Sequence, residues 1–203
     1  MKSLSEIETV SKRSSRAAGY SWGVAEEIGK NIRMLEMFGI SGIKNLNYYF
    51  RIKKKKEFEK VNLISKKNEI TKLEFCPIVA GLNFLDQVRS LETLKEIKFE
   101  KIAFPLLFLP FISRASEVIG KKLELNIDKR LFLLNYNISI YSNSLNEGIV
   151  DIGNTVSIKF QENIDSFKEN EWEELYKLSQ KTFVEENESS RSVGAGSGLT
   201  DND

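Results

Sequence analysis

Apolar side chains recur every three or four positions through the first fifty residues, which is the spacing of one buried helix face. Ser3 and Ser5 are each followed three residues later by a glutamate, the spacing of a capping box. Gly19 and Gly39 follow two of the apolar runs and suit the left-handed turn that ends a helix. We therefore predict one helix over about residues 5–18, a second over about residues 21–39 and a shorter third from residue 41.

From residue 70 the period changes to two. Polar and apolar residues alternate over 72–75, 97–102 and 122–127, as in strands that bury one face. We predict further extended segments over 131–141, 148–153 and 156–160, with helices over 81–88 and 111–119 between strands. An amphipathic helix over about 168–183 should follow, its buried side carrying Trp172, Leu175, Tyr176 and Leu178.

The predicted fold class is α+β, with an N-terminal helical unit, a central and mostly antiparallel sheet, a C-terminal helix and a glycine-rich tail. We divide the chain into a helical subdomain (1–50), a charged linker (51–68), an α+β core (69–188) and the tail (189–203). The linker holds Lys53 to Lys56, but glutamates follow and no aromatic residues alternate with the lysines, so a nucleic-acid site is not expected.

The composition excludes several kinds of chemistry. The chain has no histidine, so Ser-His-Asp and Cys-His catalysis and histidine-based metal sites are ruled out. Its single cysteine, Cys76, forms no internal disulfide, which fits a reducing compartment. With 30 basic and 29 acidic side chains, no overall field attracts polyanions. No spacing of ligands indicates a metal centre, and the sequence identifies no cofactor.

The longest apolar run, residues 102–112, is shorter than the roughly 20 residues needed to span a bilayer, and it contains two prolines. We place this run in the protein core. No signal peptide is visible at the start of the sequence. We therefore expect a cytoplasmic protein with neither a membrane nor a nucleic acid as its partner.

The tail differs most from ordinary packing sequence. Backbone amides of Gly194, Gly196 and Gly198 could surround a carboxylate or phosphate, because glycine allows close approach and unusual dihedrals. Arg191 precedes these glycines, and Asp201 and Asp203 follow them. No strand precedes the segment and no helix follows it, so it is neither a Rossmann fingerprint nor a P-loop. The alternative is a terminus without fixed structure.

A second candidate site lies at the start of the second predicted helix. Trp22 beside Gly23 makes an aromatic ledge on which a ligand or another segment could lie, although a packed core tryptophan is an equal alternative. Glu26 and Glu27 lie within the first two turns, where carboxylates interact favourably with the helix dipole.

Both ends of the chain resemble one bacterial protein family. Residues 17–27, Ala-Ala-Gly-Tyr-Ser-Trp-Gly-Val-Ala-Glu-Glu, resemble the opening of a family of unknown function that is common in marine proteobacteria. Members of that family end in Ser-Arg-x-x-Gly-Ala-Gly-x-Gly-Leu-x-Asp-Asn-Asp, and residues 190–203 have this pattern. The resemblance implies no activity, but it implies that the tail is a working part of the protein.

Two functions follow as hypotheses. In the first, an enzyme or enzyme subunit handles a polar carboxylate-type metabolite, a small-molecule ligand. The tail then folds over the second helix, Arg191 and the glycine amides bind the ligand, and Glu26, Glu27, Asp201 or Asp203 moves protons. Without histidine, a carboxylate whose pKa is raised by burial is the expected acid or base. In the second, a non-catalytic accessory or homo-oligomeric protein docks its tail on a neighbouring chain.

Overall fold

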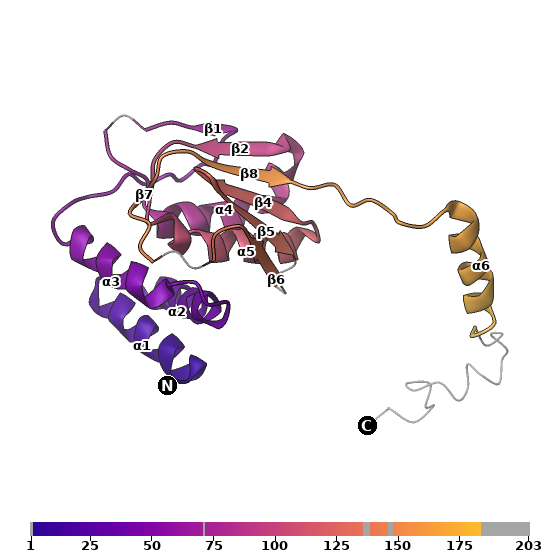
Figure 1. The fold of residues 1–203 in the computed structure, drawn as a ribbon, viewed down its shortest axis with the longest axis horizontal. Coiled ribbons are helices and arrows are strands. Elements are labelled where there is room, and N and C mark those ends of the chain that lie inside the picture. Colours follow the sequence, from indigo (N-terminus) through magenta and orange to yellow (C-terminus); the bar gives the residue numbers. More distant parts are fainter. Residues whose placement is uncertain (1, 71, 136–138, 146–147, 184–203) are drawn as a thin grey trace, which may run out of the picture. The chain divides into compact units, whose positions relative to one another are not determined.

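The computed structural model describes residues 2–70, 72–135, 139–145 and 148–183 (Figure 1). The chain divides into two compact units, residues 1–163 and residues 164–203. The first unit holds three N-terminal helices, the sheet and two further helices. The described part of the second unit holds α6 (Glu169–Gln180).

The N-terminal helices are α1 (Leu4–Ala17), α2 (Trp22–Met37) and α3 (Gly42–Lys53). Side chains cap the first two, because Ser3 accepts a hydrogen bond from the Glu6 amide and Ser21 accepts one from the Val24 amide. Gly19 and Gly39 adopt positive φ angles of 95° and 72° just beyond α1 and α2. The predicted helices and their glycine ends are thus confirmed, and α1 packs along α2.

Six strands form the main sheet in the order β1-β2-β8-β4-β5-β6, and only β1 and β2 are parallel. A separate antiparallel pair joins β3 and β7. This arrangement confirms the predicted α+β class. The strands are β1 (Lys67–Asn68), β2 (Glu96–Phe99), β3 (Ile102–Ala103), β4 (Leu123–Ile127), β5 (Arg130–Asn135), β6 (Ser139–Ser142), β7 (Ile152–Gly153) and β8 (Val156–Phe160).

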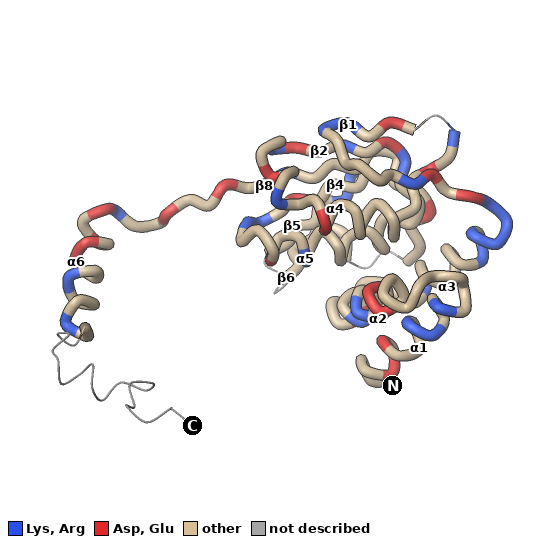
Figure 2. The backbone as a smooth tube through the Cα atoms, turned by 180° about the vertical axis from the view of Figure 1, so that it is seen from behind, with Lys and Arg blue, Asp and Glu red and all other residues tan. Residues whose placement is uncertain are grey.

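Two helices, α4 (Pro77–Leu91) and α5 (Leu109–Ile119), lie together on one face of the sheet (Figure 2). Alternate side chains of β4 are fully buried on this side, whereas Glu124 and Asn126 lie between them and are partly exposed. Glu124 pairs with Lys159 of β8 at 3.6 Å on the other face. The sheet therefore has one apolar and one polar face, as is usual for antiparallel sheets.

The apolar stretch 102–112 forms the centre of the core, as predicted. It runs from β3 through the short helices η2 (Pro105–Leu107) and α5, and its side chains are almost completely buried. Another short helix, η1 (Glu92–Leu94), ends α4. Within the described residues, none of the helices combines the length and the apolar character needed to cross a bilayer.

Three local predictions differ from the structure. Residues 72–75 form no strand, because Phe75 makes only single bridges to Glu59 and Ile102 before α4 begins. The segment 51–68, expected as a linker, includes β1 and the buried side chain of Ile64. The apolar side of α6 is exposed, since amphipathic spacing identifies a helix without supplying the surface that covers it. Its exposed side chains are Trp172, Leu175, Tyr176 and Leu178.

Candidate functional site

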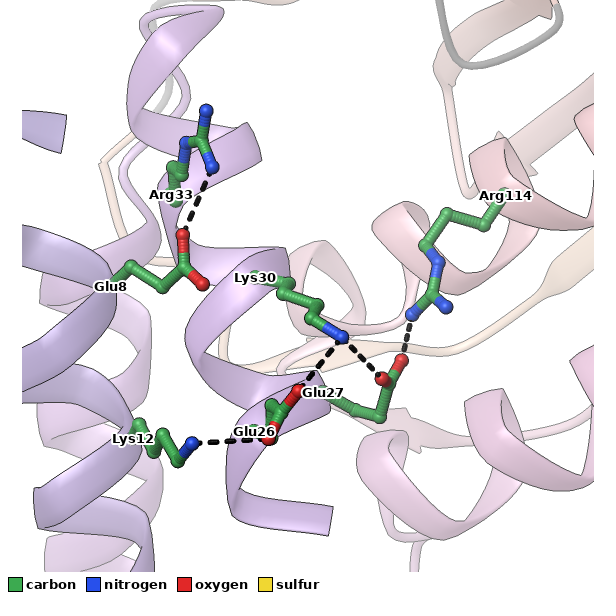
Figure 3. A network of polar contacts seen from close by, with 7 residues as sticks. All are labelled: Glu8, Lys12, Glu26, Glu27, Lys30, Arg33 and Arg114. Carbon is green, nitrogen blue, oxygen red and sulfur yellow. Dashed lines mark hydrogen bonds and ion pairs between the residues drawn. The ribbon is translucent and has the colours of Figure 1, made fainter. Parts of the chain in front are cut away.

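A network of seven charged side chains connects α2 to its two neighbours (Figure 3). Glu8 and Lys12 come from α1, and Arg114 comes from α5. The remaining four, Glu26, Glu27, Lys30 and Arg33, lie on successive turns of α2. Glu26 and Glu27, chosen from the sequence, therefore lie in a polar cluster that spans three helices.

Glu26 is bound by two lysines. Lys12 Nζ lies 3.0 Å from one carboxylate oxygen and Lys30 Nζ lies 3.1 Å from the other. The hydrogen bonds from Lys12 and Lys30 hold the pKa of Glu26 below its ordinary value. The carboxylate is thus ionised at neutral pH.

Glu27 bridges two elements, because it accepts hydrogen bonds from Lys30 at 3.2 Å and from Arg114 of α5. Partial burial pushes the pKa of Glu27 upward, but the hydrogen bonds and charges of Arg114 and Lys30 outweigh it, so the pKa is lowered. The expected rise in pKa through burial is therefore wrong for Glu26 and Glu27. Both are suited to orienting cations, since a general acid near pH 7 needs a raised carboxyl pKa.

A pocket of about 280 Å³ lies beside this network. We call it the α2–α5 pocket, because α2 contributes all of its lining residues except Arg114. Three of the lining side chains are cationic, and none of the network glutamates is among them. The lining residues are Lys30, Asn31, Arg33, Met34, Met37 and Arg114.

Asn31 is the unusual member of this lining. It is 3% exposed, and neither its Oδ1 nor its Nδ2 has a hydrogen-bond partner among the described residues. Buried Asn45 of α3 provides a contrast, because its Nδ2 donates to the carbonyls of Ser41 and Gly148 and its Oδ1 accepts from the Val150 amide. Buried polar groups without partners are rare and require an explanation.

Trp22 and Gly23 lie at the start of α2, away from the lining of this pocket. The Trp22 ring is 59% exposed and the Arg16 guanidinium lies 5.5 Å from its centre, so the alternative of a packed core tryptophan is wrong. A β-carbon at Gly23 would have no neighbour within 4 Å. Nothing in the described structure therefore requires glycine there.

The tail candidates Arg191, Gly194, Gly196, Gly198, Asp201 and Asp203 lie outside the described residues. Whether the tail meets the start of α2 is consequently not part of the site geometry. Among the described residues, no three His, Cys, Asp or Glu side chains are grouped so that they could hold a metal ion.

A second polar cluster was missed in the sequence. The hydroxyl oxygens of Tyr20 and Tyr49 lie 2.6 Å apart, and the Tyr49 hydroxyl lies 3.1 Å from Cys76 Sγ. Burial raises the pKa of both tyrosines, so they stay neutral at physiological pH. The three residues border a pocket of about 570 Å³ whose rim includes Lys53, Lys56 and Lys60. Lys53 already bonds the Ala18 carbonyl, and Lys56 is paired with Glu74.

Asn31 could have been found from its spacing. It stands three residues after Ile28 and four before Leu35, so a polar amide occupies a position of the apolar stripe. Arg114 gave no such signal, because only the folded chain brings α5 beside Glu27.

The comparisons with known proteins concern the N-terminal part. A family model described as "Protein of unknown function (DUF3726)" matches residues 2–83, which include α1, α2, α3 and the first part of α4. No curated protein and no solved structure matches the chain. The matched segment contributes every lining residue of the α2–α5 pocket except Arg114.

Proposed function

We propose that this protein binds a small carboxylate-bearing metabolite in the α2–α5 pocket, as an enzyme or enzyme subunit that acts on it. One observation carries the proposal: Lys30, Arg33 and Arg114 line a single pocket, while their glutamate partners do not. Cations that converge on one concave site are the usual means of binding a carboxylate.

The ion pairs leave these cations able to bind a ligand. An arginine has five N–H donors, and the contacts of Arg33 to Glu8 and of Arg114 to Glu27 each use the terminal nitrogen Nη1. Glu8 and Glu27 thereby fix the direction of the guanidinium groups, which lowers the entropy cost of binding. The network has four cationic and three anionic members, so its surplus positive charge suits one carboxylate.

The tail completes the site in this proposal. Arg191 and the amides of Gly194, Gly196 and Gly198 would hold the ligand, with Trp22 and Gly23 as the ledge beneath the tail. Asp201 and Asp203 would be the proton-moving groups, because the lowered pKa of Glu26 and Glu27 leaves these two glutamates as weak bases.

Carboxylate binding is tested by thermal unfolding of the full chain with sodium butyrate, using sodium chloride as the ionic-strength control. A ligand at 100 times its Kd adds about 2.7 kcal/mol of stability, which raises the Tm of a domain of this size by about 5–10 °C. Arg33→Gln should weaken butyrate binding about tenfold by removing one charge-assisted hydrogen bond. Arg33→Lys should restore part of the loss.

Arg13→Gln is the matched control, since Arg13 is exposed on α1 and does not line the pocket. The proposal is wrong if the Tm of the wild-type protein responds equally to butyrate and to chloride. It is also wrong if Arg13→Gln and Arg33→Gln weaken the response to the same degree.

The role of the tail needs its own variant. Deleting residues 190–203 should abolish the rise in Tm with butyrate if the tail completes the site, and Arg191→Ala should reproduce much of this loss. A truncated protein with the full response would remove the tail from the proposal and leave the α2–α5 pocket in it.

A second candidate function, an accessory or oligomer-forming protein, is favoured by α6. Four of its apolar side chains are between 51% and 65% exposed, and Phe167 stacks on Trp172 with ring centres 5.7 Å apart. Such a face suits docking into a groove of a partner. Light scattering should then detect an oligomer that Leu175→Asp dissociates. A monomer in both proteins contradicts this alternative.

We further propose that the resemblance to an uncharacterised bacterial family extends beyond residues 2–83 to the tail, and that the protein is cytoplasmic. The match to a family model of unknown function supports only the N-terminal part. Fractionation of bacterial cells that express the protein tests the location, and recovery from the envelope fraction would contradict it.

A further inference from the structure

The amide of Asn31 has unmet hydrogen-bonding capacity at the wall of the α2–α5 pocket. Its Nδ2 can donate and its Oδ1 can accept, and neither atom has a partner in the described part of the chain. Leaving both atoms unpaired in a nearly closed position destabilises the folded protein. A residue that lowers stability while bordering a cationic pocket is typical of a binding site.

A simple carboxylate cannot satisfy this amide. Its oxygens only accept hydrogen bonds, so they can pair with Nδ2 but leave Oδ1 unpaired. A hydroxyl group can donate to Oδ1, while the carboxylate of the same ligand binds Lys30, Arg33 or Arg114. An ammonium group also donates, but the surplus positive charge of the network opposes its entry.

Access to the amide depends on two methionines. Met34 and Met37 line the same pocket, and the unbranched thioether side chain changes conformation readily. Met37 is 52% exposed and Met34 is 7% exposed, so the pair extends from the surface to the buried amide. Movement of these side chains opens a path to Asn31 and leaves apolar contacts for a short carbon chain.

We propose that the α2–α5 pocket selects small hydroxylated monocarboxylates, with Asn31 reading the hydroxyl and Lys30, Arg33 and Arg114 holding the carboxylate. This inference rests on the proposed function. It assigns a specificity role to Asn31 that is separate from the charge attraction of its neighbours.

Three acids with one carbon skeleton test the inference: butyrate, 2-hydroxybutyrate and 2-aminobutyrate. Calorimetric titration of the full chain should give a Kd for 2-hydroxybutyrate about tenfold below that for butyrate, because only the hydroxy acid pairs both atoms of Asn31. The amino acid should bind more weakly than the hydroxy acid. In Asn31→Leu the hydroxy acid and butyrate should bind equally, and Asn47→Leu, at an exposed position of α3, should keep the preference.

Stability of the ligand-free protein supplies a second readout. Asn31→Leu should raise the Tm, because it replaces an unpaired buried amide by an apolar side chain, whereas Asn45→Leu should lower it. Asn31→Ala serves if the leucine variant does not fold. A fall in Tm for both variants at position 31 would show a structural role for this amide and overturn the inference.

The outcomes separate the two proposals. Equal binding of butyrate and 2-hydroxybutyrate by the wild-type protein overturns the hydroxyl selectivity and leaves carboxylate binding intact. Tighter binding of 2-aminobutyrate, or a hydroxyl preference that survives in the Asn31 variants, overturns the role of Asn31. Absence of binding by all three acids overturns both proposals.

Discussion

Tyr49 of α3 connects three parts of the chain through a single hydroxyl group, which contacts Tyr20 beyond α1 and Cys76 before α4. Its side chain is completely buried. Tyr49→Phe removes that hydroxyl and leaves Cys76 without this partner, so it should lower the free energy of unfolding by about 1–2 kcal/mol. Urea denaturation measures the change.

Tyr48→Phe is the control for this prediction, since Tyr48 is 41% exposed and Arg51 lies over its ring. It should change the free energy of unfolding by less than about 0.5 kcal/mol. Equal effects of the two substitutions would contradict the importance of the Tyr49 hydroxyl.

Glu27 makes stability depend on pH in a defined direction. Its folded pKa is lowered from the ordinary value of 4.5, so the unfolded chain takes up a proton first as the solution is acidified. The contribution of Glu27 is therefore present above about pH 4.5 and is lost as pH falls through the folded pKa. Denaturation between pH 3 and pH 7 should show a smaller loss in Glu27→Gln than in the wild-type protein. An identical pH profile would contradict this assignment.

Single residues were predictable only where their chemistry was local. Glu26 and Glu27 stood out as paired carboxylates near a helix start, and the structure gives them cationic partners that lower their pKa. The cation Arg114 and the hydroxyl contact between Tyr20 and Tyr49 depend on segments distant in sequence, so no local pattern revealed them.

At the scale of elements, the contact of α4 with α5 depends on Gly81. A β-carbon at this position would overlap the ring of Phe111, which is fully buried on α5. Gly81→Ala should therefore force the helices apart and lower the free energy of unfolding by about 1–3 kcal/mol, measured by thermal or urea denaturation.

Gly23→Ala in α2 makes the same chemical change where a β-carbon meets no neighbour within 4 Å. It should raise stability by up to about 1 kcal/mol, because alanine favours the helix more than glycine does. Destabilisation by Gly23→Ala would indicate that close approach at this glycine matters, as the sequence interpretation of Trp22 and Gly23 proposes.

Most helices and strands were predictable because their signals are short in range. Capping serines, glycines with positive φ and alternation in β4 and β8 all act within a few residues. The segment 72–75 alternates in the same way, but its backbone leads directly into α4 and makes only bridges at Phe75. Pairing of β1 with β2 was equally hidden, because a strand of two residues has no measurable period.

At the scale of the molecule, the core and α6 belong to different compact units. All residues of the hydrophobic core lie in residues 1–163, and no residue of α6 is buried. Removal of residues 164–203 should therefore leave the Tm of the remaining protein within a few degrees of the full chain, as measured by circular dichroism. Removal of residues 154–203 should abolish cooperative unfolding, because it deletes β8 between β2 and β4. A large loss of Tm in the shorter deletion would contradict the independence of the first unit.

The side-chain amide of Asn45 has a consequence for how the protein is made. Its partners in α3 are synthesised almost at once, but the Gly148 carbonyl and the Val150 amide come more than a hundred residues later. At translation rates of about 5–20 residues per second, the nascent helix must wait roughly 5–20 s for them. During that interval a polar group meant for the interior has only part of its final bonding. The growing chain thus emerges from the ribosome with its helical end still open to chaperones.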